Sequence, residues 1–215
     1  MKYLIPIIAL TIILISGCNL NCIGGSGNVI SEERTISGFD SVQINGAGNV
    51  YYTQGELTPL IIEGDDNLLP EVATYVSGST LVIDYKQCIR NHRPIEVTVS
   101  SENIKKLAIA GSGKIETMNE ISTDNLEIKI EGSGNIKVKG EANNLNTIIQ
   151  GSGKIETYDL LTQNSKALIQ GSGNIHVNAQ EELDVTIEGS GTVLYKGNPR
   201  TSQKVSGSGT IRNVD

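Results

Sequence analysis

Apolar and polar residues alternate along most of the chain. Between positions 126 and 139, Leu, Ile or Val stands at 126, 128, 130, 136 and 138, and most positions between them are charged or polar. The same alternation runs through 107–117 and 183–195. A period of two indicates β-strands with one buried face. Because no stretch after the N-terminal segment has helical periodicity of comparable strength, the pattern predicts an all-β protein.

A recurring triplet, Gly-Ser-Gly, interrupts the alternating segments at intervals of 18 to 21 residues. The first glycines of the triplets are Gly111, Gly132, Gly151, Gly171, Gly189 and Gly207. The second glycines are Gly113, Gly134, Gly153, Gly173, Gly191 and Gly209. A motif that recurs at nearly fixed spacing indicates a repeated structural unit. We therefore interpret these residues as structural turn glycines.

Two variants of the motif occur earlier, "GGSGNV" from Gly24 and "GAGNV" from Gly46. The 65 residues from Gly46 to Gly111 correspond to about three further intervals. This spacing predicts that irregular repeats continue through the first half of the chain.

One strand before each triplet, one strand after it, and a short return such as 140–144 together make a coil of about 20 residues. Stacked coils predict a single-stranded parallel β-helix, or β-solenoid, with Gly-Ser-Gly turns. If the alternation is unbroken, Gly132 and Gly134 face inward, where a Cβ has no room, and Ser133 faces outward. The alternative is an antiparallel β-sandwich of hairpins, which the recurrence of the same turn once per coil disfavours.

The first third of the domain is less regular, and we interpret it as the cap of the same solenoid, since terminal repeats commonly depart from the consensus. Residues 39–53 and 80–86 have the pattern of strands. Residues 65–70 indicate a polar turn followed by a short helical piece, and 91–94 a loop.

The N-terminus reads "MKYLIPIIALTIILISGC", with an early Lys, an apolar run and small residues before Cys18. This order is typical of a secretory signal peptide. Its ending resembles the bacterial lipoprotein signal, which implies that Cys18 is lipidated and becomes the mature N-terminus. We expect a signal peptide at 1–17, a lipidated N-terminus and tether at 18–33, and a solenoid domain at 34–215, lipid-anchored in the cell envelope.

Two cysteines remain, Cys22 and Cys88. An exported protein meets an oxidising environment, in which thiols tend to pair. The sequence is compatible with a Cys22–Cys88 disulfide and with two free thiols. Neither cysteine belongs to a Cys-x-x-Cys pair, so the sequence predicts no metal site.

The net charge of −7 and the isoelectric point near 4.9 disfavour a nucleic-acid partner, because phosphate binding needs clustered Lys and Arg. "GSGKI" is not a phosphate-binding loop, since the spacing that such a loop needs would place Gly and Ser or Thr where Ala108 and Ile115 stand. We therefore predict no cofactor.

A family resemblance appears in a series of short segments. They are "RTISGFDSV" from Arg34, "QG" from Gln54, "DNLLP" from Asp66, "LVI" from Leu81, and the downstream triplets. Together they resemble the head GIN domain, a domain of unknown function that has been labelled an autotransporter adhesin head. The resemblance covers residues 34–215 and implies an exported β-solenoid with no agreed catalytic residues.

Carboxylates beside basic groups are the candidate catalytic chemistry, because β-helix enzymes that act on acidic polysaccharides use such groups. The available residues are Asp65, Asp66, Glu131, Glu188, Lys129 and Arg90. Glu131 and Glu188 occupy equivalent repeat positions, which is typical of a solvated face. His92 and His176 are far apart in sequence. We therefore expect no enzyme, and no catalytic residues are assigned.

The favoured hypothesis is a membrane-tethered, non-enzymatic binding or structural module, with an envelope or surface polysaccharide or a protein as partner. The alternative is a carbohydrate-active enzyme, either a polysaccharide lyase or a hydrolase. Exposed tyrosines would favour sugar binding, and Tyr51, Tyr85 and Tyr158 are the candidates.

Overall fold

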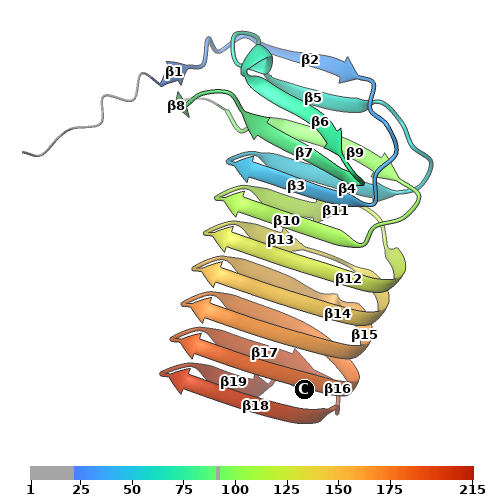
Figure 1. Ribbon diagram of the computed structural model, residues 1–215, viewed down its shortest axis with the longest axis vertical. Coiled ribbons are helices and arrows are strands. Elements are labelled where there is room, and N and C mark those ends of the chain that lie inside the picture. Colours follow the sequence, from blue (N-terminus) through green and yellow to red (C-terminus); the bar gives the residue numbers. More distant parts are fainter. Residues whose placement is uncertain (1–21, 91–92) are drawn as a thin grey trace, which may run out of the picture.

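The computed structural model of the chain describes residues 22–90 and 93–215. It is an all-β stack of parallel coils with a less regular N-terminal cap (Figure 1). The predicted β-solenoid is confirmed, and the antiparallel sandwich is wrong. Within the described residues, no helix is long and apolar enough to cross a membrane.

Each coil contributes one strand to a front layer and one to a rear layer, which meet at the Gly-Ser-Gly corner (Figure 1). The front layer consists of β3 (Ser41–Gly46), β10 (Lys106–Gly111), β12 (Ile121–Gly132), β14 (Gly140–Gly151), the second halves of β15 (Lys154–Gly171) and β16 (Asn174–Gly189), and β18 (Arg200–Gly207). The rear layer consists of β4 (Asn49–Gln54), β11 (Lys114–Thr117), β13 (Asn135–Lys137), the first halves of β15 and β16, β17 (Thr192–Lys196) and β19 (Thr210–Asn213).

The core consists of ladders of β-branched residues between the two layers. In the front layer, Ile109, Ile130, Ile149, Ile169 and Ile187 stand in register, and all are buried. In the rear layer, Ile115, Ile136, Ile155, Ile175 and Val193 form a second buried ladder. In-register stacking of identical side chains removes apolar surface from water in every coil, which explains the strict alternation of the sequence.

The two glycines of a triplet meet different constraints. Gly132 has φ of +124°, in the left-handed region, and a Cβ there would press on the carbonyl oxygen of Gly111 in the next coil. A Cβ on Gly134 would instead lie 2.7 Å from Cγ2 of Ile109, in the core. The expectation that both glycines face the core is therefore correct for Gly134 and wrong for Gly132.

The spacing argument for residues 46–111 is wrong. Gly46 pairs directly with Gly111, and β3 pairs with β10 on one side and β7 (Thr80–Tyr85) on the other. In the rear layer β4 lies likewise between β11 and β9 (Glu96–Ser101). The residues between β4 and β10 therefore add one coil above Gly46 together with the cap, in place of three repeats. Figure 1 shows this order, with β7 above β3 and β10 below it.

The cap closes the upper end of the stack. It contains β2 (Val29–Arg34), β5 (Leu60–Asp65), the 3₁₀ helix η1 (Leu69–Glu71) and β6 (Val72–Ser77). β2 and β9 both pair antiparallel with β5, and β6 pairs antiparallel with β7. The guanidinium of Arg34 donates to the carbonyl oxygens of Val72 and Leu69, at 2.6 and 2.9 Å, which fixes β2 over η1.

The early "GGSGNV" segment is not a coil corner. The hydroxyl of Ser26 donates to Asp66 at 2.6 Å, and the backbone N–H of Gly27 donates to Asp65 at 2.8 Å. The amide of Asn28 donates to the other oxygen of Asp66 at 2.8 Å. The segment therefore clasps the cap, although its sequence matches that of the repeats.

Candidate functional site

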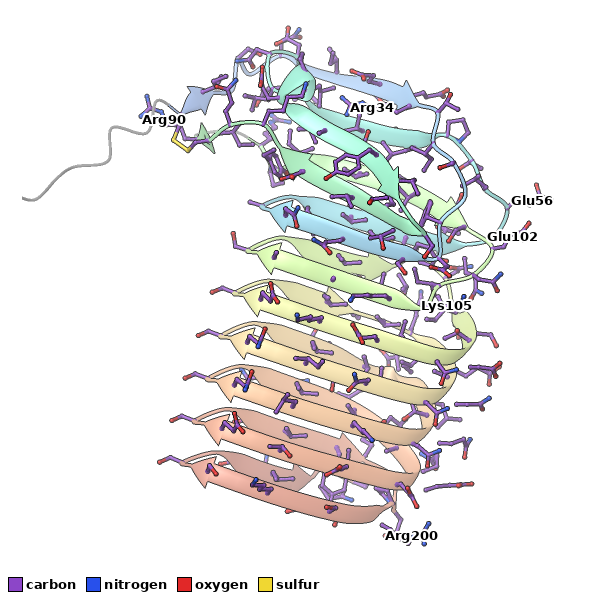
Figure 2. The ribbon with its side chains drawn as sticks, viewed as in Figure 1. Arg34, Glu56, Arg90, Glu102, Lys105 and Arg200 are labelled. Carbon is purple, nitrogen blue, oxygen red and sulfur yellow. A yellow bond between two sulfur atoms is a disulfide. The ribbon has the colours of Figure 1, made fainter. Side chains whose placement is uncertain are left out.

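Cys22, the first residue that the structure describes, takes part in a disulfide. Cys22 and Cys88 are bonded, and β1 (Ile23–Gly24) pairs with β8 (Ile89–Arg90) beside the bond. Of the predicted tether at 18–33, residues 29–33 belong to the cap strand β2, and residues 23–28 lie against the cap. Cys18 is outside the described residues. Figure 2 shows Arg90 and the disulfide at the cap end of the molecule.

A groove of about 910 Å³ runs along the edge opposite the Gly-Ser-Gly corners, where the coils return from the rear layer to the front. Three successive returns contribute to it, at 122–125, 141–143 and 161–163. The β9–β10 connection and Leu57 of the β4–β5 connection line its upper end. Figure 2 shows Glu56, Glu102 and Lys105 along this edge. The volume is in the range of pockets that hold small ligands.

Amide, carboxylate and hydroxyl side chains make up most of the groove lining. The side chain of Asn143 donates to Asp124 at 2.8 Å, and the side chain of Asn144, just behind it, donates to Asn125 at 3.1 Å. Glu102 and Glu141 add carboxylates. The amides both donate and accept hydrogen bonds and the carboxylates accept them, which suits a ligand rich in hydroxyl groups.

The upper part of the groove combines an ion pair with apolar surface. Lys105 Nζ lies 2.7 Å from Asp40 Oδ2, and this hydrogen bond holds the pKa of Asp40 below its usual range. Leu57 and Leu161 line the groove with 42% and 43% of their surface exposed. The groove therefore offers apolar contact as well as polar partners.

The carboxylates proposed as catalytic candidates do not converge. Asp65 and Asp66 hold the clasp at the top of the cap. Glu131 pairs with Lys129 at 2.5 Å on the front layer, and Glu188 accepts a hydrogen bond from Gln170 at 2.8 Å. Arg90 lies beside the disulfide. These residues therefore lie in separate parts of the molecule and do not form one site.

The histidines and tyrosines are also dispersed. His92 is outside the described residues. The ring of His176 stacks on Tyr158 with centroids 4.7 Å apart, and burial lowers the pKa of His176. Tyr85 covers Gly46 and Gly48 and donates to the carbonyl of Ala47, and burial raises its pKa to about 12. Within residues 22–90 and 93–215, no group of three or more His, Cys, Asp or Glu is placed to hold a metal ion.

Sequence reasoning missed the groove, although a signal for it was present. The returns read "TDN" at 123–125, "ANN" at 142–144 and "TQN" at 162–164, so polar residues recur with the same period as the triplets. The corresponding strand register places Asn125, Asn144 and Asn164 side by side. A second periodic motif indicates a second repeated edge of the solenoid.

Comparison with known proteins gives consistent results. A family profile described as "Putative auto-transporter adhesin, head GIN domain" matches residues 38–199. A search of curated proteins found no match.

Solved bacterial proteins share the fold. A putative adhesin from Bacteroides fragilis is 28% identical, with a TM-score of 0.73 over 89% of this chain and 100% of that one. A putative lipid binding protein from Parabacteroides distasonis is 26% identical, with a TM-score of 0.61 over 90% of this chain and 99% of that one. A putative adhesin from Parabacteroides distasonis is 20% identical, with a TM-score of 0.62 over 90% of this chain and 100% of that one, and shows the fold alone.

Proposed function

Because the chain belongs to the family described as "Putative auto-transporter adhesin, head GIN domain", we propose that it is a non-enzymatic, adhesin-like binding domain exported to the cell envelope. A lipid on Cys18 holds it to a membrane, and the groove along the return edge binds the hydroxyl groups of a glycan. The lipoprotein-like leader supports the first part of this proposal.

The observation that carries the glycan assignment is the composition of the groove. Successive coils place equivalent amide, carboxylate and hydroxyl groups along one edge, next to the exposed Leu57 and Leu161. Adjacent coils are about 4.8 Å apart, so equivalent groups recur along the length of an extended sugar chain. Repeated weak contacts with a polymer add through effective concentration.

A glycan array tests the proposal with the wild-type chain and two variants. Asn143→Ala combined with Gln163→Ala removes polar groups from the groove, and we expect about tenfold weaker binding, as the loss of two hydrogen bonds implies. Ser133→Ala combined with Ser152→Ala, on exposed corners at the opposite edge, should leave binding unchanged.

A release assay on the glycans that bind separates the proposed function from the enzymatic one. We expect no new reducing ends and no unsaturated sugar. Production of either, abolished by a single Asp or Glu substitution, would contradict a non-enzymatic function. If both double variants bind equally well, the ligand-binding site lies outside the groove.

A further inference from the structure

The outward positions of the rear layer carry an excess of positive charge. We call these cations the basic face, which consists of Lys114, Lys137, Lys139, Lys154, Lys196 and Arg212. Glu116 and Glu156 are the carboxylates at the paired outward positions of β11, β13 and β15, and Asp159 is exposed just after them in β15. The whole chain has a net charge of −7, so positive charge is concentrated on one side of an acidic protein.

The contacts on this face leave part of the charge unneutralised. Glu116 accepts a hydrogen bond from Lys114 at 2.6 Å and lies 3.9 Å from Lys137, and its pKa is lowered chiefly by the bond from Lys114. Lys154 pairs with Glu156. Two carboxylates therefore account for only part of the positive charge.

Among the described residues, the other three cations form no ion pair, and Lys139 acts on Glu116 only at longer range, where it helps to lower the pKa of that carboxyl. In the part of the chain that the structure describes, Lys139, Lys196 and Arg212 form no ion pair with a carboxylate. Lys196 instead lies over the ring of Tyr158, with Nζ 5.0 Å from its centroid. These three cations are available to an anionic partner.

The front layer has a different charge pattern. Lys106 pairs with Glu127 at 2.8 Å, and Lys129 with Glu131 at 2.5 Å. Asp184 and Glu188 add further acidic groups at its outward positions. Since the two layers use the same coil geometry, the excess of cations on the rear layer is a property of its sequence.

The cations are distributed along the solenoid axis, and Lys137 and Arg212 stand at the two ends of one row of equivalent positions. Register places Lys137, Glu156, His176, Leu194 and Arg212 at equivalent positions of successive coils. At about 4.8 Å per coil, the ends of this row are about 19 Å apart. Outward side chains that can form hydrogen bonds with a ligand lie between the cations, among them Asn174, Asn178 and Thr192.

We propose that the basic face binds an anionic, carboxylate-bearing polysaccharide laid along the solenoid axis. This inference rests on the proposed binding function and gives it a second surface with its own ligand chemistry. Charge complementarity favours a polyanion, and the interspersed amides and hydroxyls match sugar hydroxyl groups. A bilayer surface is less well matched, since Met118 is the one large hydrophobic side chain exposed on this face among the described residues.

The test compares three polymers. The purified protein is titrated with polygalacturonate, with neutral dextran and with duplex DNA, at low and at physiological salt. We expect saturable binding to polygalacturonate that weakens as salt rises, and much weaker binding to dextran and DNA. Vesicles containing phosphatidylglycerol form a fourth arm.

Two matched triple variants locate the site. Lys139→Gln, Lys196→Gln and Arg212→Gln together should weaken binding to polygalacturonate by about tenfold or more. Lys166→Gln, Lys204→Gln and Arg200→Gln remove the same charges elsewhere and should change affinity little (Figure 2 shows Arg200 at the lower end of the stack).

Four outcomes would overturn the inference. They are equal loss in both triple variants, binding to DNA as tight as to polygalacturonate, binding to vesicles without binding to the polysaccharide, and absence of binding to any polyanion. If polyanion binding is absent while ligands on the glycan array still bind, only this inference fails. If no glycan of any kind binds, the proposed function fails with it.

Discussion

At the scale of single residues, the Gly-Ser-Gly corner combines a backbone requirement with a packing requirement. The first glycine supplies a positive φ and lets two coils approach, as Gly132 does against Gly111. The second leaves room for an isoleucine of the neighbouring coil, as Gly134 does for Ile109. The serine between them is exposed. The two glycines therefore exclude a side chain for different reasons, whereas the exposed serine position can accept one.

A substitution at the second glycine tests this division. We expect Gly134→Val to lower the free energy of unfolding by about 3 kcal/mol, because its side chain would overlap Ile109 and the carbonyl of Gly113. Ser133→Val should change it by about 0.5 kcal/mol or less. Urea denaturation of both variants measures the difference. A larger loss for Ser133→Val would show that the inward phase is displaced by one residue.

Alternation and repeat spacing predicted which side of each strand is buried from Leu107 onward, because these signals are local. They could not predict the contact of Tyr85 with Gly46 and Gly48. That contact joins residues about 40 positions apart, and a lone tyrosine carries no periodic signal. Because the sequence gives no sign of this contact, Tyr85 was interpreted as a candidate for sugar binding.

At the scale of elements, the last coil differs from those above it. In β18, Thr201, Gln203 and Val205 pair with Leu183, Val185 and Ile187 of β16. Polar residues thus replace two core residues in this coil, and Val205 is 44% exposed. A polar terminal repeat is what a solenoid needs to stay soluble at its open end. Thr201 and Gln203 thereby limit edge-to-edge association.

Restoring the consensus at this end should therefore promote self-association. For Thr201→Leu combined with Gln203→Val, we expect an apparent mass that rises with concentration in sedimentation or light-scattering measurements. Ser202→Leu combined with Ser206→Val adds apolar area at outward positions of the same strand and serves as the control. Identical behaviour of the two variants would indicate that general surface hydrophobicity, and not the open end, drives association.

Element prediction was accurate where neighbours in sequence are neighbours in space and failed where they are not. From Gly111 to Gly207 each coil stacks on the preceding one, so spacing alone gave the architecture. The pairing of Gly46 with Gly111 spans an insertion, and interval counting has no means of detecting an insertion. The groove depends on the same nonlocal arrangement, since its upper wall comes from the β4–β5 and β9–β10 connections.

At the scale of the whole molecule, the proposed lipid on Cys18 would determine the end from which the domain is held. Four residues precede Cys22 if the mature chain starts at Cys18, and an extended chain spans at most about 3.5 Å per residue. A lipid on Cys18 would therefore keep the disulfide-bonded cap within about 14 Å of a membrane. The last coil would be the end farthest from the anchor along the solenoid axis.

Metabolic labelling with a fatty-acid analogue tests the anchor. We expect label in the wild-type protein and none in Cys18→Ala, which should also leave the membrane fraction, because the thioether sulfur that would carry the lipid is absent. Ser16→Ala keeps a small residue before the cysteine and should retain the label. Equal labelling of wild type and Cys18→Ala would exclude lipidation at this position.

The position of β3 and β4 between two later coils determines the order in which the domain can assemble. A chain that crosses a membrane from its N-terminus delivers these strands first, yet both of their edges lack partners until β7 and β9 on one side and β10 and β11 on the other have followed. We therefore expect the folding nucleus to span roughly residues 41–117, at the entropic cost of closing a long loop. Once this part has folded, each later coil can pair with the exposed strand edges of the preceding coil as soon as it has crossed the membrane.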